Sequence, residues 1–206
     1  MIRPQETVDP HLETDRTRLR PMLAEDVDLA RALLTDAAVM RYVTDPVPPD
    51  AVASGMDTWT RRGAGGRLGI WAVIDKDTDA KLGDCVLLPL PIDAEDTVWD
   101  EVRPDHWPPG PIEVGYLLRP EAWGRGLATE ICARLLRFGF ETAGMRQIYA
   151  VADPGNTASH NVLRKCGLRS LGKRRAYGCD DTSWFCITGS AWAAQASHQY
   201  PSGSPG

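Results

Sequence analysis

Apolar and polar residues alternate along this chain with two periods, one typical of strands and one typical of helices. Residues 24–34 show the helical period: Val27, Ala30, Leu33 and Leu34 are spaced for one face, with acidic residues at the positive end of the helix dipole. Short apolar runs bounded by polar turns show the other period. The pattern predicts strands at 16–20, 70–75, 82–88, 112–118, 147–152, 170–176 and 182–188, and helices at 24–34, 50–62, 126–142 and 157–166.

Three segments show neither the helical nor the strand period. Residues 1–13 are polar and are predicted to form a loose arm, and the Ser/Gly/Pro-rich residues 195–206 are predicted to be disordered. Residues 89–111 hold six of the sixteen prolines and two of the seven tryptophans. A loop of that length inside a compact domain is typically either functional or disordered. The chain of 206 residues is therefore predicted to form one domain over residues 14–194, with 89–111 as an insertion.

Charge and hydropathy argue against two classes of partner. Lys and Arg total 23 against 28 acidic residues, a net charge of −5, which disfavours binding through nucleic-acid phosphates. The longest apolar runs, such as 71–74 and 85–88, are far shorter than a membrane span, and the first ten residues lack the apolar core of a signal peptide. We therefore expect a soluble cytoplasmic protein that binds neither nucleic acid nor membrane.

The cysteines indicate reduced thiols rather than a metal site. There are five of them, they are scattered, and no Cys-x-x-Cys pair or zinc-finger spacing to histidine occurs. They are predicted to serve as small apolar residues in a reducing compartment, and no metal is expected.

The strongest chemical signal is a glycine turn between a predicted strand and a predicted helix. Gly124 and Gly126 allow the backbone to approach a ligand closely, and the N–H groups of the following helical turn favour an anion such as a pyrophosphate. A Walker loop would need Gly-Lys-Ser/Thr, whereas this turn has Gly126-Leu-Ala-Thr129. A dinucleotide fingerprint would need a small residue at 129 and repeated strand–helix–strand units. A tight turn without a ligand is the remaining alternative.

The sequence around this turn resembles the acyl-CoA loop of the GNAT N-acetyltransferase superfamily, (Gln/Arg)-x-x-Gly-x-(Gly/Ala), in the run Trp123-Gly-Arg-Gly-Leu-Ala128. Other segments resemble the RimJ/RimL-like branch in the same order, over about residues 14–190. They are Thr17-Arg-Leu-Arg-Pro21, Val39-Met-Arg-Tyr42, Glu113-Val-Gly-Tyr116, Asn156-Thr-Ala-Ser159 and Lys165-Cys-Gly-Leu168. Trp123 stands where the family has Gln or Arg, and Leu168 where it has Phe.

The resemblance implies an α/β (α+β) fold with a single GNAT-type domain. Its central twisted sheet would be mixed but mostly antiparallel, with splayed central strands and helices on both faces. It also implies acetyl-CoA as co-substrate, with the pantetheine arm added at the edge of the strand near 117–119. A backbone N–H near Leu118 would stabilise the oxyanion. The implied cofactor-binding residues are Leu117, Leu118, Arg119, Gly124, Arg125, Gly126, Leu127, Ala128, Thr129, Asn156 and Ser159.

Acetyl transfer to an amine needs a base and an acid. Glu113 is the candidate general base, since it interrupts an apolar strand on the face of Gly115 and Leu117; a solvent-facing strand residue is the alternative. Ser159 is the candidate acid or thiol-anchoring hydroxyl, and Asn156 the partner of a pantetheine amide. The alternative for this pair is a helix N-cap and its supporting residue. The tyrosine acid of other branches would fall near Leu163, and Tyr116, on the opposite face from Glu113, is assigned to packing.

These residues predict an acetyl-CoA-dependent N-acetyltransferase that acts on a primary amine. A non-catalytic acyl-CoA sensor on the same fold is the alternative. The acceptor class includes protein N-termini and cationic small molecules, and the protein is expected to be a monomer or homodimer. Loop 89–111 carries a net charge of −5, together with Trp99 and Trp107, and we expect it to form a wall of the acceptor site that attracts cationic amines. A solvated excursion without substrate contact is the alternative for this loop.

Overall fold

The computed structural model describes residues 7–199 and contains one eight-stranded sheet with the strand order β1-β2-β3-β4-β5-β6-β8-β7. Neighbouring strands are antiparallel except β5 and β6. The predicted sheet, mixed and mostly antiparallel, is therefore confirmed. The strands are β1 (Leu12–Glu13), β2 (Thr17–Pro21), β3 (Gly69–Asp75), β4 (Lys81–Pro89), β5 (Ile112–Leu118), β6 (Gln147–Ala152), β7 (Arg169–Ala176) and β8 (Cys179–Thr188).

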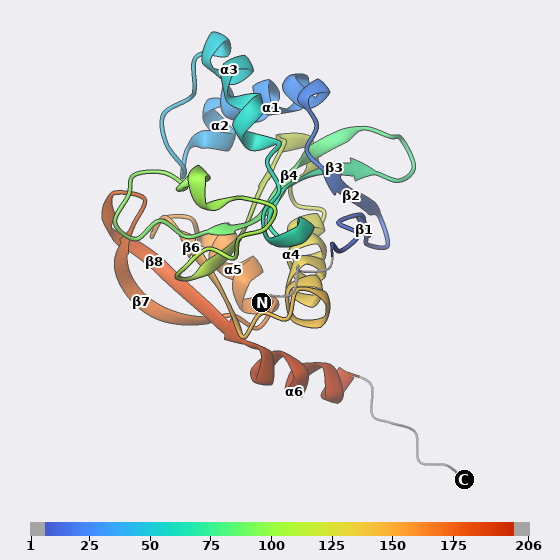
Figure 1. Cartoon of the computed structure of the whole chain (residues 1–206), viewed down its shortest axis with the longest axis vertical. Helices are drawn as coiled ribbons and strands as arrows, with labels where there is room; N and C mark the ends of the chain where they lie inside the picture. The colour runs from blue at the N-terminus through green and yellow to red at the C-terminus, as the bar shows by residue number, and fades with distance from the viewer. Residues whose placement is uncertain (1–6, 200–206) are drawn as a thin grey trace.

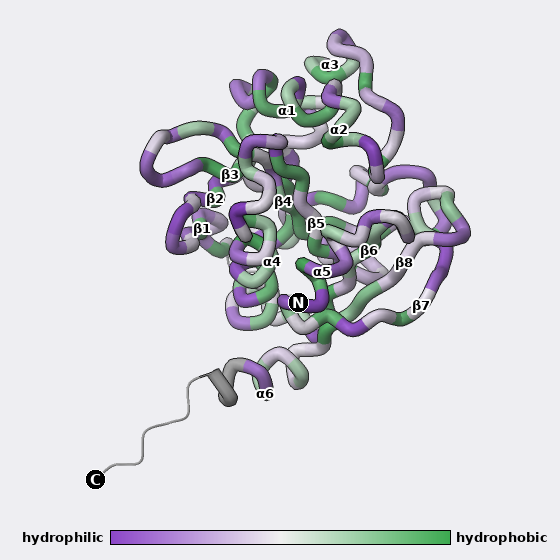
Figure 2. The backbone as a smooth tube through the Cα atoms, turned by 180° about the vertical axis from the view of Figure 1, so that it is seen from behind, coloured by the Kyte–Doolittle hydropathy of each residue, from purple (hydrophilic) through white to green (hydrophobic). Residues whose placement is uncertain are grey.

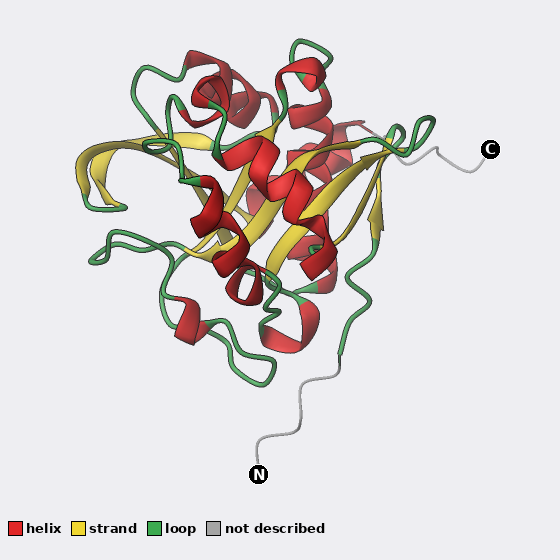
Figure 3. Ribbon diagram, turned by 90° about the horizontal axis from the view of Figure 1, so that it is seen from above, coloured by secondary structure: helices red, strands yellow, loops and turns green. Residues whose placement is uncertain are grey.

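Helices cover both faces of this sheet, as predicted (Figures 1 and 3). One face packs against α1 (Val27–Leu34), α2 (Ala37–Met40) and α3 (Pro49–Trp59), and the other against α4 (Leu127–Arg137) and α5 (Thr157–Lys165). The last helix, α6 (Gly189–Gln199), extends from the end of β8. Among residues 7–199, no helix is long and apolar enough to cross a membrane.

The central strands β5 and β6 separate almost as soon as they meet. Seven residue pairs join β4 to β5, whereas Glu113 and Tyr149 form the single registered pair between β5 and β6. From Val114 onward, the β6-facing edge of β5 therefore has no registered strand partner among the described residues. The predicted splay of two central strands is present at this position.

The apolar core is continuous on one face of the sheet and divided on the other. Under α4 and α5, a single cluster joins side chains of β3, β4, β5, β6 and β8. On the opposite face, one cluster packs α1–α3 against β3 and β4, and a separate small cluster contains Leu90, Ala176 and Trp184 with Tyr149, Val151 and Tyr177. The division follows the β5–β6 separation. In Figure 2 the middle strands are the most apolar, and β7 at the edge is mostly polar.

Residues 7–13 are docked, contrary to the loose arm predicted for 1–13. Leu12 is buried and pairs with Leu19, and the Trp71 indole donates to the Pro10 carbonyl at 2.6 Å. The segment also donates from the Val8 N–H to Gly65. The buried Trp71 indole needs a hydrogen-bond acceptor, and the Pro10 carbonyl supplies it. This bond helps to hold residues 7–13 against the sheet although their own sequence is polar. Residues 1–6 of the predicted arm lie outside the described residues.

The predicted disordered tail 195–206 is wrong for residues 195–199, which continue α6. The helix begins in an alanine-rich stretch, and Trp192 lies 5.5 Å from Phe140 between ring centroids. Alanine propensity and this aromatic contact favour the helix where Ser and Gly suggested a coil. Residues 200–206 lie outside the described part of the chain.

One predicted helix ends early, and another reaches its predicted end with a change of winding. The helix predicted over 50–62 is α3, and it ends at Trp59 with Thr60 as its C-cap. The helix predicted over 126–142 is α4, which continues as a π-helical turn over Phe138–Thr142. At Gly139 an added Cβ would lie 2.4 Å from the Ile148 side chain, so this turn needs glycine to approach β6. The short helix α2 has no counterpart in the predicted elements.

The insertion 89–111 is anchored at both sides. It contains the short 3₁₀ turn Trp99–Glu101, and its Pro91 carbonyl accepts from the Tyr177 N–H in the β7–β8 turn. Farther along, the carbonyls of Arg103 and Pro104 accept from the backbone that precedes β3. Figure 1 shows the segment in green beside the curved β7–β8 hairpin. The loop therefore covers the small apolar cluster on the Glu113 face.

Candidate active site

The turn before α4 has the geometry of an anion cradle. Gly124 and Gly126 adopt positive φ angles of 69° and 78°, and Gly126 is the N-cap of α4. A Cβ at Gly124 would meet nothing within 4 Å, so the space in front of this turn is open. Within residues 7–199, the N–H groups of residues 124–129 donate to no other atom of the chain. Six unpaired donors at the positive end of a helix dipole fit a pyrophosphate.

Arginine side chains support the turn from outside. Arg16 donates from Nη1 to the Arg125 carbonyl at 2.9 Å and from Nε to Glu130 Oε2 at 2.8 Å. The Arg125 guanidinium lies 3.5 Å from Asp75 Oδ2. Because Glu130 largely neutralises its charge, Arg16 serves to hold the turn through the Arg125 carbonyl. Sequence reasoning did not identify Arg16, since its contacts lie more than 100 residues away in sequence.

Trp123, which replaces the usual Gln or Arg, has a structural contact of its own. Its indole donates from Nε1 to the Leu118 carbonyl at 2.7 Å, while the ring remains half exposed. The bond joins the end of β5 to the start of the glycine turn. Trp123 therefore helps to shape the cradle.

The predicted strand edge at 117–119 is only partly available to a ligand. The Arg119 N–H donates to the Leu82 carbonyl at 2.9 Å, so it faces β4 rather than the gap. Because N–H groups alternate along an extended strand, the Leu118 N–H faces the opposite edge, where β6 has separated. The Arg119 N–H is therefore used within the sheet, whereas the Leu118 N–H faces the gap; the role of residues 117–119 in cofactor binding stays a prediction.

Glu113 is buried beside the point where β5 and β6 separate. Its side chain is 4% exposed, which rules out the solvent-facing alternative, and its carboxylate accepts a hydrogen bond from the Tyr177 hydroxyl. Burial raises the pKa of Glu113 to about 8, and the hydrogen bond from Tyr177 partly opposes that rise. A carboxyl group with a pKa near neutrality is suited to proton transfer.

Tyr177 comes from the turn between β7 and β8, and sequence reasoning missed it. Tyr177 and Gly178 both have positive φ, 51° and 71°, as in the two-residue turns that match the twist of a hairpin. The turn directs the tyrosine to Glu113, 64 residues away in the sequence. The Tyr177-Gly178 pair between two predicted strands indicated a turn. The sequence did not indicate that Tyr177 would contact Glu113.

A second carboxyl group on the same face was also missed. Asp84 pairs with Leu117 in register, on the face that carries Glu113 and Gly115. Burial raises the pKa of Asp84 to about 7, and a hydrogen bond from the backbone of Leu117 opposes the rise. Four residues of strand separate the register positions of the two carboxyl groups, roughly 13 Å. Asp84 is therefore a competing candidate for the base.

Asn156 and Ser159 lie at the start of α5. The Asn156 side chain accepts from the Ser159 N–H at 3.1 Å. Asn156 is therefore the N-cap of α5, as in the alternative that the sequence left open. The Ser159 hydroxyl lies 3.1 Å from the Tyr116 hydroxyl, within hydrogen-bond distance. Tyr116 was assigned to packing, but it also holds Ser159 against β5. Leu163 is buried in the core below them.

The predicted catalytic residues flank β5 from opposite faces. Glu113 lies with Tyr177 on the face of the divided core, and Ser159 lies with Tyr116 on the face of α4 and α5. The structure does not bring these two groups into contact. It places one on each side of the gap through which a pantetheine arm would pass, which suits a base at the amine and a hydroxyl at the thiol.

Several acidic residues of loop 89–111 have local partners. Asp100 lies 3.6 Å from Arg61, Glu101 contacts His106, and Asp96 accepts from the Thr97 N–H. Trp107 packs against the main core. The attraction of cationic amines by this loop stays a prediction.

Comparison with known proteins decides the family. The family model described as an acetyltransferase (GNAT) domain matches residues 16–169. The chain belongs to the GNAT family. GNAT enzymes use acetyl-CoA as co-substrate, and this chain is an acetyl-CoA-dependent acyltransferase.

Individual relatives agree with this assignment. YkkB of Bacillus subtilis (strain 168) is 32% identical over 160 residues, covering 76% of this chain and 84% of YkkB. The uncharacterized N-acetyltransferase p20 of Bacillus licheniformis is 28% identical over 171 residues, covering 81% of this chain and 86% of p20. The crystal structure of a GCN5-related N-acetyltransferase from Brucella melitensis superimposes with a TM-score of 0.69 at 22% identity, covering 95% of this chain and 86% of that one. The last comparison shows the GNAT fold.

Proposed function

We propose that this GNAT enzyme is an N-acetyltransferase that transfers the acetyl group of acetyl-CoA directly to a primary amine. The acceptor would be a protein N-terminus or a small-molecule amine, in line with the sequence resemblance to the RimJ/RimL-like branch. One observation carries the proposal: unpaired N–H groups at the start of α4 lie next to a sheet edge left open by the β5–β6 separation. The first feature suits a pyrophosphate and the second a pantetheine arm.

Each candidate residue has a task in this reaction. Acetyl-CoA supplies the thioester acyl group. The N–H groups of residues 124–129 would bind the pyrophosphate, and the Asn156 amide would bind an amide of the pantetheine arm. The Leu118 N–H would stabilise the negative charge that develops on the carbonyl oxygen.

Proton transfers would complete the reaction on the two faces of β5. The amine nitrogen forms a bond to the thioester carbon and loses a proton to Glu113, and the carbon–sulfur bond breaks. Ser159, held by Tyr116, would give a proton to the leaving thiolate. Glu113 must be ionised to accept the proton, so activity should rise with pH through its pKa of about 8.

The binding half of the proposal is tested by thermal unfolding. Acetyl-CoA at 100 times its dissociation constant should stabilise the protein by about 2.7 kcal/mol. Pantetheine, which lacks the pyrophosphate, should produce a much smaller shift. Gly126→Val should abolish the shift, since a branched side chain at this N-cap would obstruct the cradle.

A matched control separates that effect from backbone strain. Gly172 also has a positive φ, 81°, and open space around it, but it lies on the exposed edge strand β7. Gly172→Val should lower the melting temperature to a similar degree and keep the acetyl-CoA shift. Loss of the shift in both variants, or its absence in the unmodified protein, would contradict the assigned cradle.

A thiol-release assay across primary amines tests the transfer half. Release of CoA thiol that depends on an amine, with an increase of 42 Da in the mass of that amine, supports N-acetylation. Thiol release without any acetylated amine in the panel would contradict it.

A further inference from the structure

A cavity of about 740 Å³ opens on the Glu113 face of the sheet, beyond the starts of β5 and β6. Its size falls within the range of small-molecule sites. Loop 89–111, the segment before β6, and strands β6, β7 and β8 each contribute to its walls. Its chemistry is set by Trp107, Arg146, Tyr149, Arg174, Arg175 and Trp184.

All charged side chains that line this cavity are positive. Three arginines line it, and no Asp or Glu does so among the described residues. Arg175 is bonded to Asp180 at 2.6 Å and is therefore partly neutralised. Arg146 and Arg174 have no carboxylate partner within residues 7–199. Two uncompensated guanidinium groups in one concave site favour an anion, and their planar geometry suits a carboxylate.

The remaining walls are aromatic. The rings of Tyr149 and Trp184 meet edge to face at 5.9 Å, and the Arg174 guanidinium lies over the Trp184 ring at 5.8 Å. Trp184 is 4% exposed, and its buried Nε1 has no hydrogen-bond partner among the described residues. A buried donor without an acceptor is uncommon, because it forfeits the hydrogen bond that water would supply. Aromatic walls suit a flat apolar body attached to the anion.

The cavity is connected to the proposed base. Ile112 in its wall precedes Glu113 in the chain, and Tyr149 is the registered partner of Glu113 across the sheet. Tyr149 and Trp184 also belong to the same apolar cluster as Tyr177, whose hydroxyl donates to Glu113. The cavity and the proposed base therefore share one face and one packed group of side chains.

We propose that this cavity binds the carboxylate and aromatic body of the acceptor, whose amine extends toward Glu113. The acceptor would then be a zwitterion of the aromatic amino-acid type rather than a purely cationic amine. This inference rests on the proposed N-acetyltransferase function, which supplies the reaction at Glu113. The carboxylate would pair with Arg174, whose guanidinium lies over the Trp184 ring, and Arg146 would add positive charge at the other end of the cavity.

A ligand that cannot be acetylated tests the site without relying on activity. Indole-3-propionate carries the ring and the carboxylate but no amine, and indole-3-propionamide is its neutral counterpart. In isothermal titration calorimetry, the carboxylate should bind at least tenfold more tightly than the amide, and its affinity should fall as salt is added. The double variant Arg146→Gln/Arg174→Gln should lose at least tenfold in affinity for the carboxylate and little for the amide.

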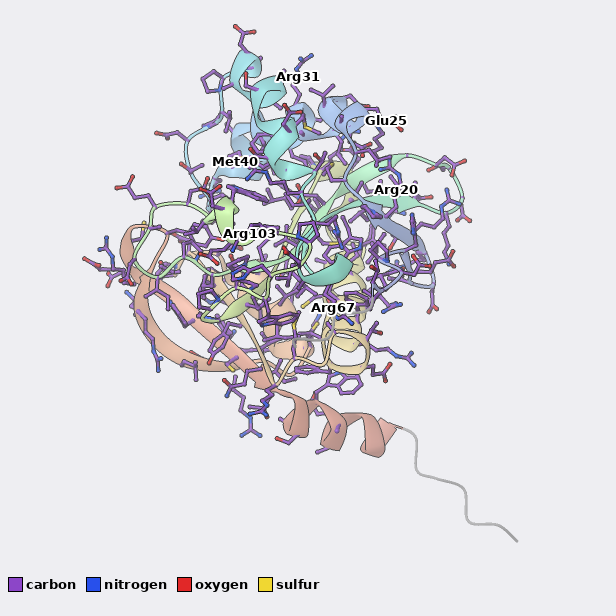
Figure 4. All side chains as sticks on the ribbon, in the orientation of Figure 1. Arg20, Glu25, Arg31, Met40, Arg67 and Arg103 are labelled. Carbon is purple, nitrogen blue, oxygen red and sulfur yellow. The ribbon has the colours of Figure 1, made fainter. Side chains whose placement is uncertain are left out.

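Arg31→Gln is the matched control, because Arg31 is an exposed arginine of α1 in the helical group at the top of Figure 4, away from the β7–β8 hairpin. This variant should bind indole-3-propionate like the unmodified protein. Equal affinity for the carboxylate and the amide, or equal affinity in the double variant and the unmodified protein, would overturn the anion site.

The acceptor role is tested separately with tryptophan and tryptamine. Tryptophan should have at least a tenfold higher kcat/KM than tryptamine, and indole-3-propionate should compete with tryptophan but not with acetyl-CoA. Binding of indole-3-propionate without such competition would overturn the acceptor role. Absence of acetyl transfer to every amine would instead refute the proposed function, and the calorimetric result would stand on its own.

Discussion

At the scale of single residues, the central feature is a carboxyl group on each of two neighbouring strands, both on one face, of which Glu113 is buried and Asp84 half-buried. Glu113 lies at the β5–β6 separation and Asp84 farther along the sheet. Both have a pKa raised by burial, so pKa alone does not choose between them. We propose Glu113 as the base because of its position: it contacts Tyr177 and borders the gap between β5 and β6.

We expect Glu113→Gln and Ser159→Ala each to lower kcat by roughly 10²-fold, a typical loss for a positioned acid or base. Both variants should keep the acetyl-CoA thermal shift. The Glu113→Gln defect should shrink at high pH, where the amine is already deprotonated. Stopped-flow thiol release measures kcat, and Asp84→Asn is the comparison: a larger loss in Asp84→Asn than in Glu113→Gln would transfer the role of base to Asp84.

The residues that could be predicted are those whose signal is local. Glu113 could be identified because a carboxylate interrupts an apolar strand, and Gly126 because a glycine pair precedes a helical pattern. Asp84 stands in a strand as apolar as that of Glu113 but lacks a neighbouring motif. Tyr177 and Arg16 could not be found, since each acts through a contact at least 64 residues away.

At the scale of elements, the β7–β8 hairpin and loop 89–111 act as one cover over the Glu113 face. The turn at Tyr177 and Gly178 bonds to Pro91, and a Cβ at Gly178 would lie 3.1 Å from Glu95. The hairpin therefore holds the Tyr177 hydroxyl in place. We assign Tyr177 as a positioning residue for Glu113.

Tyr177→Phe should shift the pH dependence of activity. The lost hydrogen bond stabilised the ionised carboxylate, so the pKa of Glu113 should rise above its value of about 8. The acidic limb of the profile of kcat/KM against pH should then move to higher pH, with recovery at alkaline pH. A uniform loss at every pH would indicate a structural role instead. Tyr149→Phe, on the neighbouring strand, should leave this limb in place.

Elements with a strong internal period were predictable, and those held by tertiary contacts were not. Strands β2 to β6 and β8, and helices α1, α3, α4 and α5, follow their apolar spacing, whereas the predicted strand β7 is mostly polar. Strand β1 is two residues long and is held by its pairing with β2 and by the Trp71–Pro10 bond nearby. Helix α2 spans four residues, too few for a period to be detected. The ends of α3 and α4 depend on local capping and on the Gly139–Ile148 approach.

At the scale of the whole molecule, stability should depend on pH through a buried ion-pair network. Asp26 is fully buried, and it accepts from both terminal nitrogens of Arg20 and lies 3.0 Å from Lys81. Burial alone would raise the pKa of Asp26, but these bonds, with one from the Leu23 N–H, lower it to about 2. The network joins β2, the start of α1 and β4.

Because the folded pKa lies below the unfolded value, the stabilisation is complete above about pH 4 and is lost as the pH falls toward 2. The free-energy difference between the unmodified protein and Asp26→Asn should therefore shrink by about 2 kcal/mol over that range. Urea unfolding at successive pH values measures it. Asp28→Asn, which removes the exposed partner of Lys81, is the control. The free-energy difference between the unmodified protein and Asp28→Asn should change little over the same pH range. A pH-independent difference for Asp26→Asn would contradict the network's role.

The single residue pair between β5 and β6 means that two parts of the sheet meet along a seam with almost no backbone ladder. On the face of α4 and α5 a common core joins the parts, and on the other face their cores are separate. With this arrangement, we expect the two parts of the sheet to bend relative to each other at the β5–β6 seam. The shared core under α4 and α5 would act as the hinge. A pantetheine arm bound between β5 and β6 would supply the missing hydrogen bonds. Binding of acetyl-CoA would then make the part of the sheet that carries the proposed acceptor cavity more rigid.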